Sequence, residues 1–280
     1  MLTWILRLFA HLPLPLIHAL GICVGWCIYL GTERHARRTR TNLTASGIAT
    51  NPAHFRHLLH QNIAESGKGV LESFAIWLRP PHEVLRWVRE CHGWEHVEAA
   101  LKLKRGIIFL TPHLGCFEIT SQYYSARHPI SVLYRPPRQA WLAPLIEAGR
   151  ERGQTTLAPT NMKGVRTLLK ALKQGEAVGI LPDQNPGKGE GEWADFFGRP
   201  AYTMTLASRL AEATNATVLL AFGERLPRGR GYVIHFEPLQ AKPEPVAINA
   251  AIEKLVRRKP EQYLWSYSRH RVPRGETPPT

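Results

Sequence analysis

The stretch "GIIFLTPHLGCFEI", residues 106–119, places His113 just after a short apolar run and Glu118 five residues further on. Positions five apart on one helix point about 140° from each other, so these two side chains cannot share a helix face. They can meet if Pro112 ends a strand, with His113 in the turn and Glu118 in the first helical turn. The carboxylate would then accept one imidazole N–H, leaving the other nitrogen free to take a proton from a hydroxyl. The spacing alone fits a structural histidine as well.

Two further polar clusters follow apolar runs elsewhere in the chain. One runs from Arg135 to Arg138 after "ISVLY", and the other runs from Asp183 to Gly191 after "AVGIL". Ligands of open α/β sheets bind at the carboxyl ends of the strands, so we expect the three clusters to converge on one rim. Both clusters also have a structural interpretation. Arg135 can be a surface arginine before two prolines, and Asp183 can cap a turn.

The elements that position these clusters follow from periodicity and from Gly and Pro breaks. Residues 51–102 show helical spacing with a break at Pro80 and Pro81, and the helix resumes over 83–106. Further on, the pattern predicts strands over 106–110, 130–135, 216–226 and 231–238, a strand that runs into a polar loop over 176–184, and helices over 141–153, 162–175, 203–215 and 246–260. This alternation indicates an α/β fold with a mostly parallel central sheet flanked by helices.

The amino terminus predicts contact with a membrane. Residues 8–32 contain no Asp, Glu, Lys or Arg, and Arg34, Arg37, Arg38 and Arg40 follow directly. A helix from Leu16 to Leu30 would be roughly 22 Å long, short for a bilayer core of roughly 30 Å. A helix lying in one leaflet therefore fits best, with a single span and a buried core helix as alternatives. Only Arg7 precedes the apolar run and no cleavage site follows it, which disfavours a signal peptide.

Composition narrows the partners. The 36 Lys and Arg residues outnumber the 22 Asp and Glu residues, giving a net charge of +14 and indicating an anionic partner. Nucleic acid, an anionic lipid surface and an acidic carrier protein all meet that requirement. The basic residues between 257 and 274 could lie on a headgroup plane or form a solvated tail. The four cysteines form no CxxC pair, which favours a reducing compartment.

Four blocks in order resemble one family, the lipid A biosynthesis (late) acyltransferases of the lauroyl/myristoyl type, whose fold is like that of glycerolipid acyltransferases. They are "HLGCFE", similar to the His-x4-Asp/Glu signature; "VLYRPPRQ"; "GILPDQNPGKGEGEWADFFGRPAYT"; and "PEQYLWSYSRHR", with "RTRTNL" after the apolar amino terminus. The resemblance covers nearly the whole chain. One departure is Tyr267, which stands where the family often has His.

The resemblance implies transfer of a fatty acyl chain from acyl carrier protein to a hydroxyl of a lipid A precursor, at the cytoplasmic face of the bacterial inner membrane. It implies His113 as general base, Glu118 as its orienting partner, and Arg135 as the group that stabilises an oxyanion or holds a phosphate. It suggests substrate contacts for Arg138, Asp183, Gln184, Phe196, Phe197, Gly198, Arg199 and Thr203. Core packing for the two Phe residues and a helix N-cap for Thr203 are the structural alternatives. Cys116 is interpreted as a packing residue rather than a nucleophile.

The resemblance implies neither a metal nor a cofactor. We expect residues 1–32 to associate with the membrane, residues 33–275 to form the acyltransferase domain, and residues 276–280 to be a tail. One alternative is acyl transfer to another lipid, such as a phosphatidylinositol mannoside, a lysophospholipid or an aminolipid. A basic nucleic-acid-binding protein is the other, but no zinc-finger, RNP or helix-turn-helix motif supports it, so we expect no nucleic acid partner.

Overall fold

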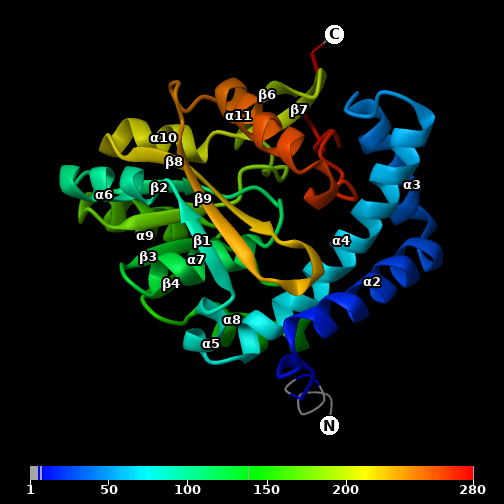
Figure 1. Ribbon diagram of the computed structural model, residues 1–280. Helices are drawn as coiled ribbons and strands as arrows, with labels where there is room; N and C mark the ends of the chain where they lie inside the picture. The colour runs from blue at the N-terminus through cyan, green and yellow to red at the C-terminus, as the bar shows by residue number, and fades with distance from the viewer. Residues whose placement is uncertain (1–5, 7, 138, 280) are drawn as a thin grey trace.

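The computed structural model describes residues 6, 8–137 and 139–279, and Figure 1 shows their arrangement. Within these residues a seven-stranded sheet has the order β1-β9-β8-β2-β5-β3-β4, and only the β8–β9 pair is antiparallel. Its strands are β1 (Val88–His92), β2 (Ile107–Leu110), β3 (Ile130–Tyr134), β4 (Thr155–Pro159), β5 (Ala177–Ile180), β8 (Thr217–Arg225) and β9 (Tyr232–Pro238). The predicted α/β class with a mostly parallel sheet is confirmed.

Helices cover both faces of the sheet. The described helices are α2 (Leu14–Gly31), α3 (Glu33–Ala45), α4 (Pro52–Leu78), α5 (Pro81–Leu85), α6 (Trp94–Leu103), α7 (Phe117–Ser125), α8 (Ala143–Arg150), α9 (Met162–Lys173), α10 (Leu206–Thr214) and α11 (Pro245–Arg258). Successive strand residues point to opposite faces. In β2, Ile108 and Leu110 pack with α9, α10 and α11, whereas Ile107 and Phe109 pack with α6, α7 and α8.

The prediction of one helix over 83–106 is wrong. That segment forms α5, the edge strand β1 and α6, because Gly93 turns the chain with φ +79° where a Cβ would overlap the carbonyl of Phe236. The prediction also omitted β4 and the hairpin of β6 (Gly191–Phe196) and β7 (Arg199–Met204). All three missed regions are partly exposed and carry few consecutive apolar residues, so their periodicity is weak.

The amino-terminal helix packs against the rest of the molecule along its length. By length and composition, α2 is the helix among the described residues that could cross a membrane. It runs beside α4 at the right of Figure 1. A Cβ on Gly67 of α4 would overlap the backbone of Gly21 and Gly25 of α2, so glycine at these positions allows the two helix backbones to touch.

A buried ionic network lies where α2, α4 and the sheet meet. The Glu72 carboxylate accepts hydrogen bonds from Arg225 Nε at 2.9 Å and from the Tyr232 hydroxyl at 2.8 Å, and His18 Nε2 lies 3.1 Å from it. Burial alone would raise the pKa of Glu72, but the Arg225 guanidinium and His18 hold that pKa well below its usual range. Glu72 is therefore ionised, and the stability of the network depends on its cation.

Replacing Arg225 with Met tests this network. The substitution leaves the Glu72 charge buried without its main cation, and we expect unfolding to become easier by about 3–5 kcal/mol. Denaturant unfolding of the purified protein measures the change. Glu237→Gln, which breaks the surface pair with Arg258, is the matched control, expected to cost about 0–1 kcal/mol. Equal losses in both variants would contradict the assigned role of Arg225.

Candidate active site

His113 is held by Asp183 across two neighbouring strands. It follows β2, and Asp183 follows β5, the strand paired in parallel with β2. The carboxylate lies 2.8 Å from His113 Nδ1 through Oδ1 and accepts the His113 backbone N–H at 2.9 Å through Oδ2. Asp183 is buried, and the His113 side chain is 11% exposed. The expected convergence of the first and third polar clusters is thus present at this rim.

The contact that we predicted between Glu118 and His113 is not formed in this structure. Glu118 instead accepts hydrogen bonds from Arg150, whose Nε lies 3.0 Å from Oε2 and 3.2 Å from Oε1. Helix α7 begins at Phe117, whose ring centroid lies 4.9 Å from that of His113, so the first residue of the helix, rather than Glu118, contacts the imidazole. Spacing along the chain could not reveal Asp183 as the partner, because it lies 70 residues away.

The contacts of His113 define its neutral tautomer. Burial would raise the pKa of Asp183, but the charge and hydrogen bonds of His113, together with Arg269, lower it. An ionised carboxylate only accepts hydrogen bonds, so the proton of the imidazole lies on Nδ1. Nε2 then carries a lone pair and accepts from the Gln184 side-chain amide at 3.1 Å. This nitrogen is therefore available as a base for a hydroxyl that displaces Gln184.

The carboxyl-terminal block, residues 260–271 ("PEQYLWSYSRHR"), supports the loop that carries Asp183. The Tyr267 hydroxyl accepts the Asn185 backbone N–H at 2.9 Å. Arg269 is only 3% exposed and donates to the Tyr202 carbonyl at 2.8 Å and the Thr203 hydroxyl at 2.6 Å. Arg269 therefore cannot belong to a headgroup plane, which corrects that prediction for this residue. The sequence offered a weak signal for it, as one arginine in a basic run.

Among the described residues, the others singled out from the sequence form no hydrogen bond with the imidazole. Arg135 is exposed just after β3, at the carboxyl end of a strand next to β5, and Arg138 lies outside the described residues. Phe196 and Phe197 are buried against Tyr263 and Trp265.

Gly198 (φ +67°) and Phe197 (φ +51°) form the two-residue turn of the β6–β7 hairpin, and Arg199 begins β7. Thr203 is not a helix N-cap, because it lies in β7 and α10 starts only at Leu206.

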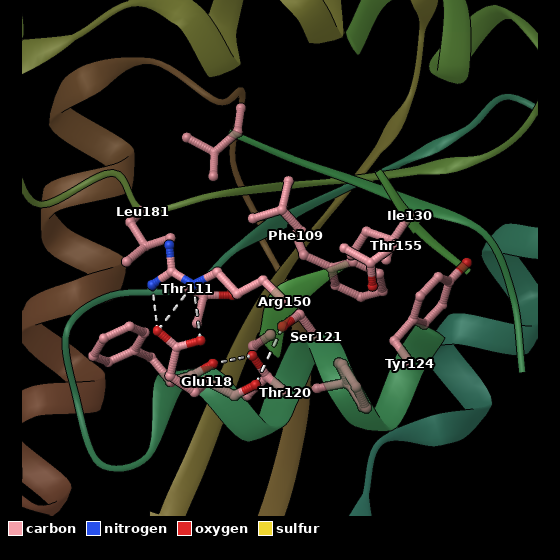
Figure 2. Close-up of a pocket in the computed structure, with 16 residues that line it drawn as sticks. Phe109, Thr111, Glu118, Thr120, Ser121, Tyr124, Ile130, Arg150, Thr155 and Leu181 are labelled. Atoms are coloured by element: carbon pink, nitrogen blue, oxygen red, sulfur yellow. Dashed lines mark hydrogen bonds and ion pairs between the residues drawn. The ribbon is translucent and has the colours of Figure 1, made fainter. Parts of the chain in front are cut away.

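An apolar cavity lies beside the site, between α7 and the sheet. Its lining includes Phe109, Phe117, Ile130, Val132 and Gly179, with Glu118 and Arg150 as its charged members. Figure 2 shows the Arg150 guanidinium pointing at the Glu118 carboxylate at one end, with Tyr124 and Thr155 towards the other end. The cavity volume is about 40 Å³. An apolar ligand larger than this volume can therefore bind only if side chains of the lining move.

Cys116 does not resemble a nucleophile. The residue is 2% exposed, and burial raises the pKa of its thiol well above the ordinary value, so the reactive thiolate is disfavoured. Within residues 6, 8–137 and 139–279, no group of three His, Cys, Asp or Glu side chains is placed to hold a metal ion. The groups that meet at the described site are an imidazole and a carboxylate.

Comparisons with known proteins identify the family of this chain. A family model described as bacterial lipid A biosynthesis acyltransferase matches residues 1–271. The chain is 28% identical to the lipid A biosynthesis lauroyltransferase of Escherichia coli (strain K12), over 97% of this chain and 92% of the relative. It is 27% identical to the palmitoleoyltransferase (99% and 93%) and 23% identical to the myristoyltransferase (90% and 78%) of the same strain. The chain is an acyltransferase and belongs to the bacterial lipid A biosynthesis acyltransferase family.

Proposed function

We propose that this enzyme moves a fatty acyl chain from acyl carrier protein to a hydroxyl of a lipid A precursor, with His113 as general base. The observation that carries the mechanism is the His113–Asp183 pair with Nε2 turned to the Gln184 amide. Family membership supports the acceptor class. The net charge of +14 suits both an acidic carrier protein and a phosphorylated lipid.

In this mechanism the acceptor hydroxyl replaces Gln184 at His113 Nε2. The imidazole takes the hydroxyl proton as the oxygen attacks the thioester carbonyl, and Asp183 stabilises the resulting imidazolium. Collapse of the tetrahedral intermediate breaks the C–S bond, and the proton passes to the departing thiolate. The reaction requires no covalent enzyme intermediate. In this proposal the exposed Arg135, on the same edge of the sheet, binds the oxyanion or an acceptor phosphate.

The apolar cavity is where we propose that the acyl chain enters. Phe117, whose ring lies next to the imidazole, lines this cavity, and the Glu118–Arg150 pair lies at one end of it. Access then requires Arg150 or Phe117 to move. In this proposal residues 1–32 hold the protein on the cytoplasmic face of the inner membrane, where carrier protein and lipid acceptor meet, and residues 33–275 carry the reaction.

We predict that His113→Ala lowers kcat by about 10²–10⁴-fold, because no base then takes the proton of the acceptor hydroxyl. Transfer from a radiolabelled acyl-carrier-protein thioester to a purified lipid A precursor measures the rate. His82→Ala removes an exposed histidine on α5 and should leave the rate unchanged. Wild-type turnover by folded His113→Ala protein would refute the proposed base. Turnover with acyl coenzyme A but not with the acyl-carrier-protein thioester would refute the proposed donor.

Asp183→Asn tests the orienting carboxylate. The new amide can still accept the His113 backbone N–H, but its NH₂ group faces Nδ1 and favours the tautomer with the proton on Nε2. We predict a fall in kcat of about 10²–10⁴-fold with KM nearly unchanged, measured in the same assay. Unaltered kcat in a variant with an unchanged unfolding midpoint would show that Asp183 does not orient the base.

Gly179→Ala tests the acyl site. A Cβ at Gly179 would meet Val132 at 3.4 Å and Ile130 at 3.6 Å, both in the cavity lining, so one methyl group fits with little strain while it narrows the cavity. We predict a shift in preference towards shorter acyl chains, by about one or two carbons, measured with mixed-length thioester donors. The same chain-length profile in both proteins would place the acyl chain elsewhere.

A further inference from the structure

The outer face of α2 is a continuous apolar stripe. Its exposed members recur at spacings of three and four residues, so they lie on one side of the helix. They are Leu16, Leu20, Cys23, Cys27 and Leu30, and among them Leu16 is 52% and Leu30 is 75% exposed. We use the name α2 stripe for these five residues. Between Leu14 and Gly31 the helix has no charged residue to bring water to this face.

The opposite face of α2, and the residues just before the helix, contact the acyltransferase domain at several points. Before the helix, Arg79 at the end of α4 donates to the backbone carbonyls of Ala10 and Leu12. Within it, His18 contacts Glu72 of the buried network, and the Gly21–Gly67 approach brings the helix backbones together. Both the start and the middle of α2 therefore stay on the domain.

The helix that follows α2 is fastened to the same domain. On α3, the Asn42 side-chain amide donates to the carbonyls of Trp265 at 2.7 Å and Tyr267 at 2.8 Å. These carbonyls belong to the carboxyl-terminal block, which supports the loop that carries Asp183. Because the segments before and after α2 both return to one domain, the two ends of α2 cannot lie on opposite sides of a bilayer.

The length of α2 and the charged residues beside it also argue against a transmembrane helix. The 18 residues of α2 give a length of about 27 Å, less than the roughly 30 Å of a bilayer core. Along this length α4 carries Glu65, Lys68 and Glu72. If α2 crossed the bilayer, these groups and Arg225 would enter the hydrocarbon with it, at a cost of several kcal/mol for each uncompensated charge.

We infer that α2 lies in the plane of the membrane and inserts the α2 stripe into one leaflet of an anionic phospholipid bilayer, without crossing it. Helix α3 follows α2 on the same flank of the molecule (Figure 1). Its exposed arginines, Arg34, Arg37, Arg38 and Arg40, complement anionic headgroups. This inference deepens the proposed membrane location but does not depend on which acyl donor or acceptor the enzyme uses.

Depth measurement separates an in-plane helix from a span. Residues 16, 23 and 30 share the stripe and extend over about 21 Å of helix. Full-length protein is prepared with one exposed thiol at each position in turn (Leu16→Cys, native Cys23, Leu30→Cys), with the other exposed cysteines changed to Ser. A nitroxide on each thiol then reports depth in phosphatidylglycerol-containing vesicles. Leu103→Cys on α6, an exposed apolar position on the opposite flank, is the control outside the bilayer.

We expect the labels at residues 16, 23 and 30 to lie at similar, shallow depths in the bilayer, and the label at residue 103 to remain in water. A spanning helix would place residue 23 about 10 Å deeper than residues 16 and 30, and that result would overturn the inference. Labels that stay in water on vesicle-bound protein would overturn it equally.

Vesicle co-sedimentation tests the surface by substitution. Leu20→Glu should weaken binding at least tenfold, while Leu103→Glu should not change it. Arg37→Gln with Arg38→Gln should weaken binding to anionic vesicles by about 25-fold and leave binding to neutral vesicles unchanged. If Leu20→Glu instead dissociates a dimer without affecting vesicle binding, the stripe is an interface between copies of this chain and the inference fails. In every arm, denaturant unfolding confirms that the variant is folded.

Discussion

The hydrogen bond between the Asp183 carboxylate and His113 Nδ1 is the interaction on which the proposed chemistry depends. It fixes the ring through two contacts of one carboxylate, one to the imidazole and one to the His113 backbone. A buried carboxylate is costly unless it is paired, and here the pairing also sets the tautomer. The sheet makes this possible, because β2 and β5 run in parallel with residues 107–110 and 177–180 in register. The loops that carry His113 and Asp183 therefore leave the sheet at the same level.

The rest of the fold stabilises this arrangement from two directions. The carboxyl-terminal block fixes the Asp183 loop through Tyr267 and Arg269, and its Leu264 backbone N–H donates to the His113 carbonyl at 3.0 Å. On α4, Asn62 donates to the carbonyls of Glu261 and Tyr263 in the same block. Helices α3 and α4 therefore hold a segment that contacts the loops of both His113 and Asp183. In our interpretation, membrane attachment through α2 sets where the active-site rim stands relative to the lipid surface.

The sequence predicted the parts of the fold with strong local patterns. Strands β2, β3 and β5 are short apolar runs bounded by Pro, Gly or polar residues, and α9 is amphipathic, so each was recognised near its true bounds. Edge strand β1 and the β6–β7 hairpin carry weak patterns, because neither "VRECH" nor "GEWADF" alternates apolar and polar residues as a half-exposed strand usually does. In the site, sequence reasoning found His113 and the cluster that contains Asp183. It paired His113 with Glu118 because they are near in sequence, whereas pairing with Asp183 and the Glu118–Arg150 contact arise from strand order.

The tautomer of His113 is the most direct test of the account. Nitrogen NMR of the ¹⁵N-histidine-labelled enzyme, with the His113 signals identified by their loss in His113→Gln, reports which ring nitrogen carries the proton. The account predicts a proton on Nδ1 and an unprotonated Nε2 in the neutral ring. A neutral ring with its proton on Nε2 would mean that the nitrogen facing Gln184 cannot accept a hydroxyl proton, and would contradict the assignment of His113 as general base.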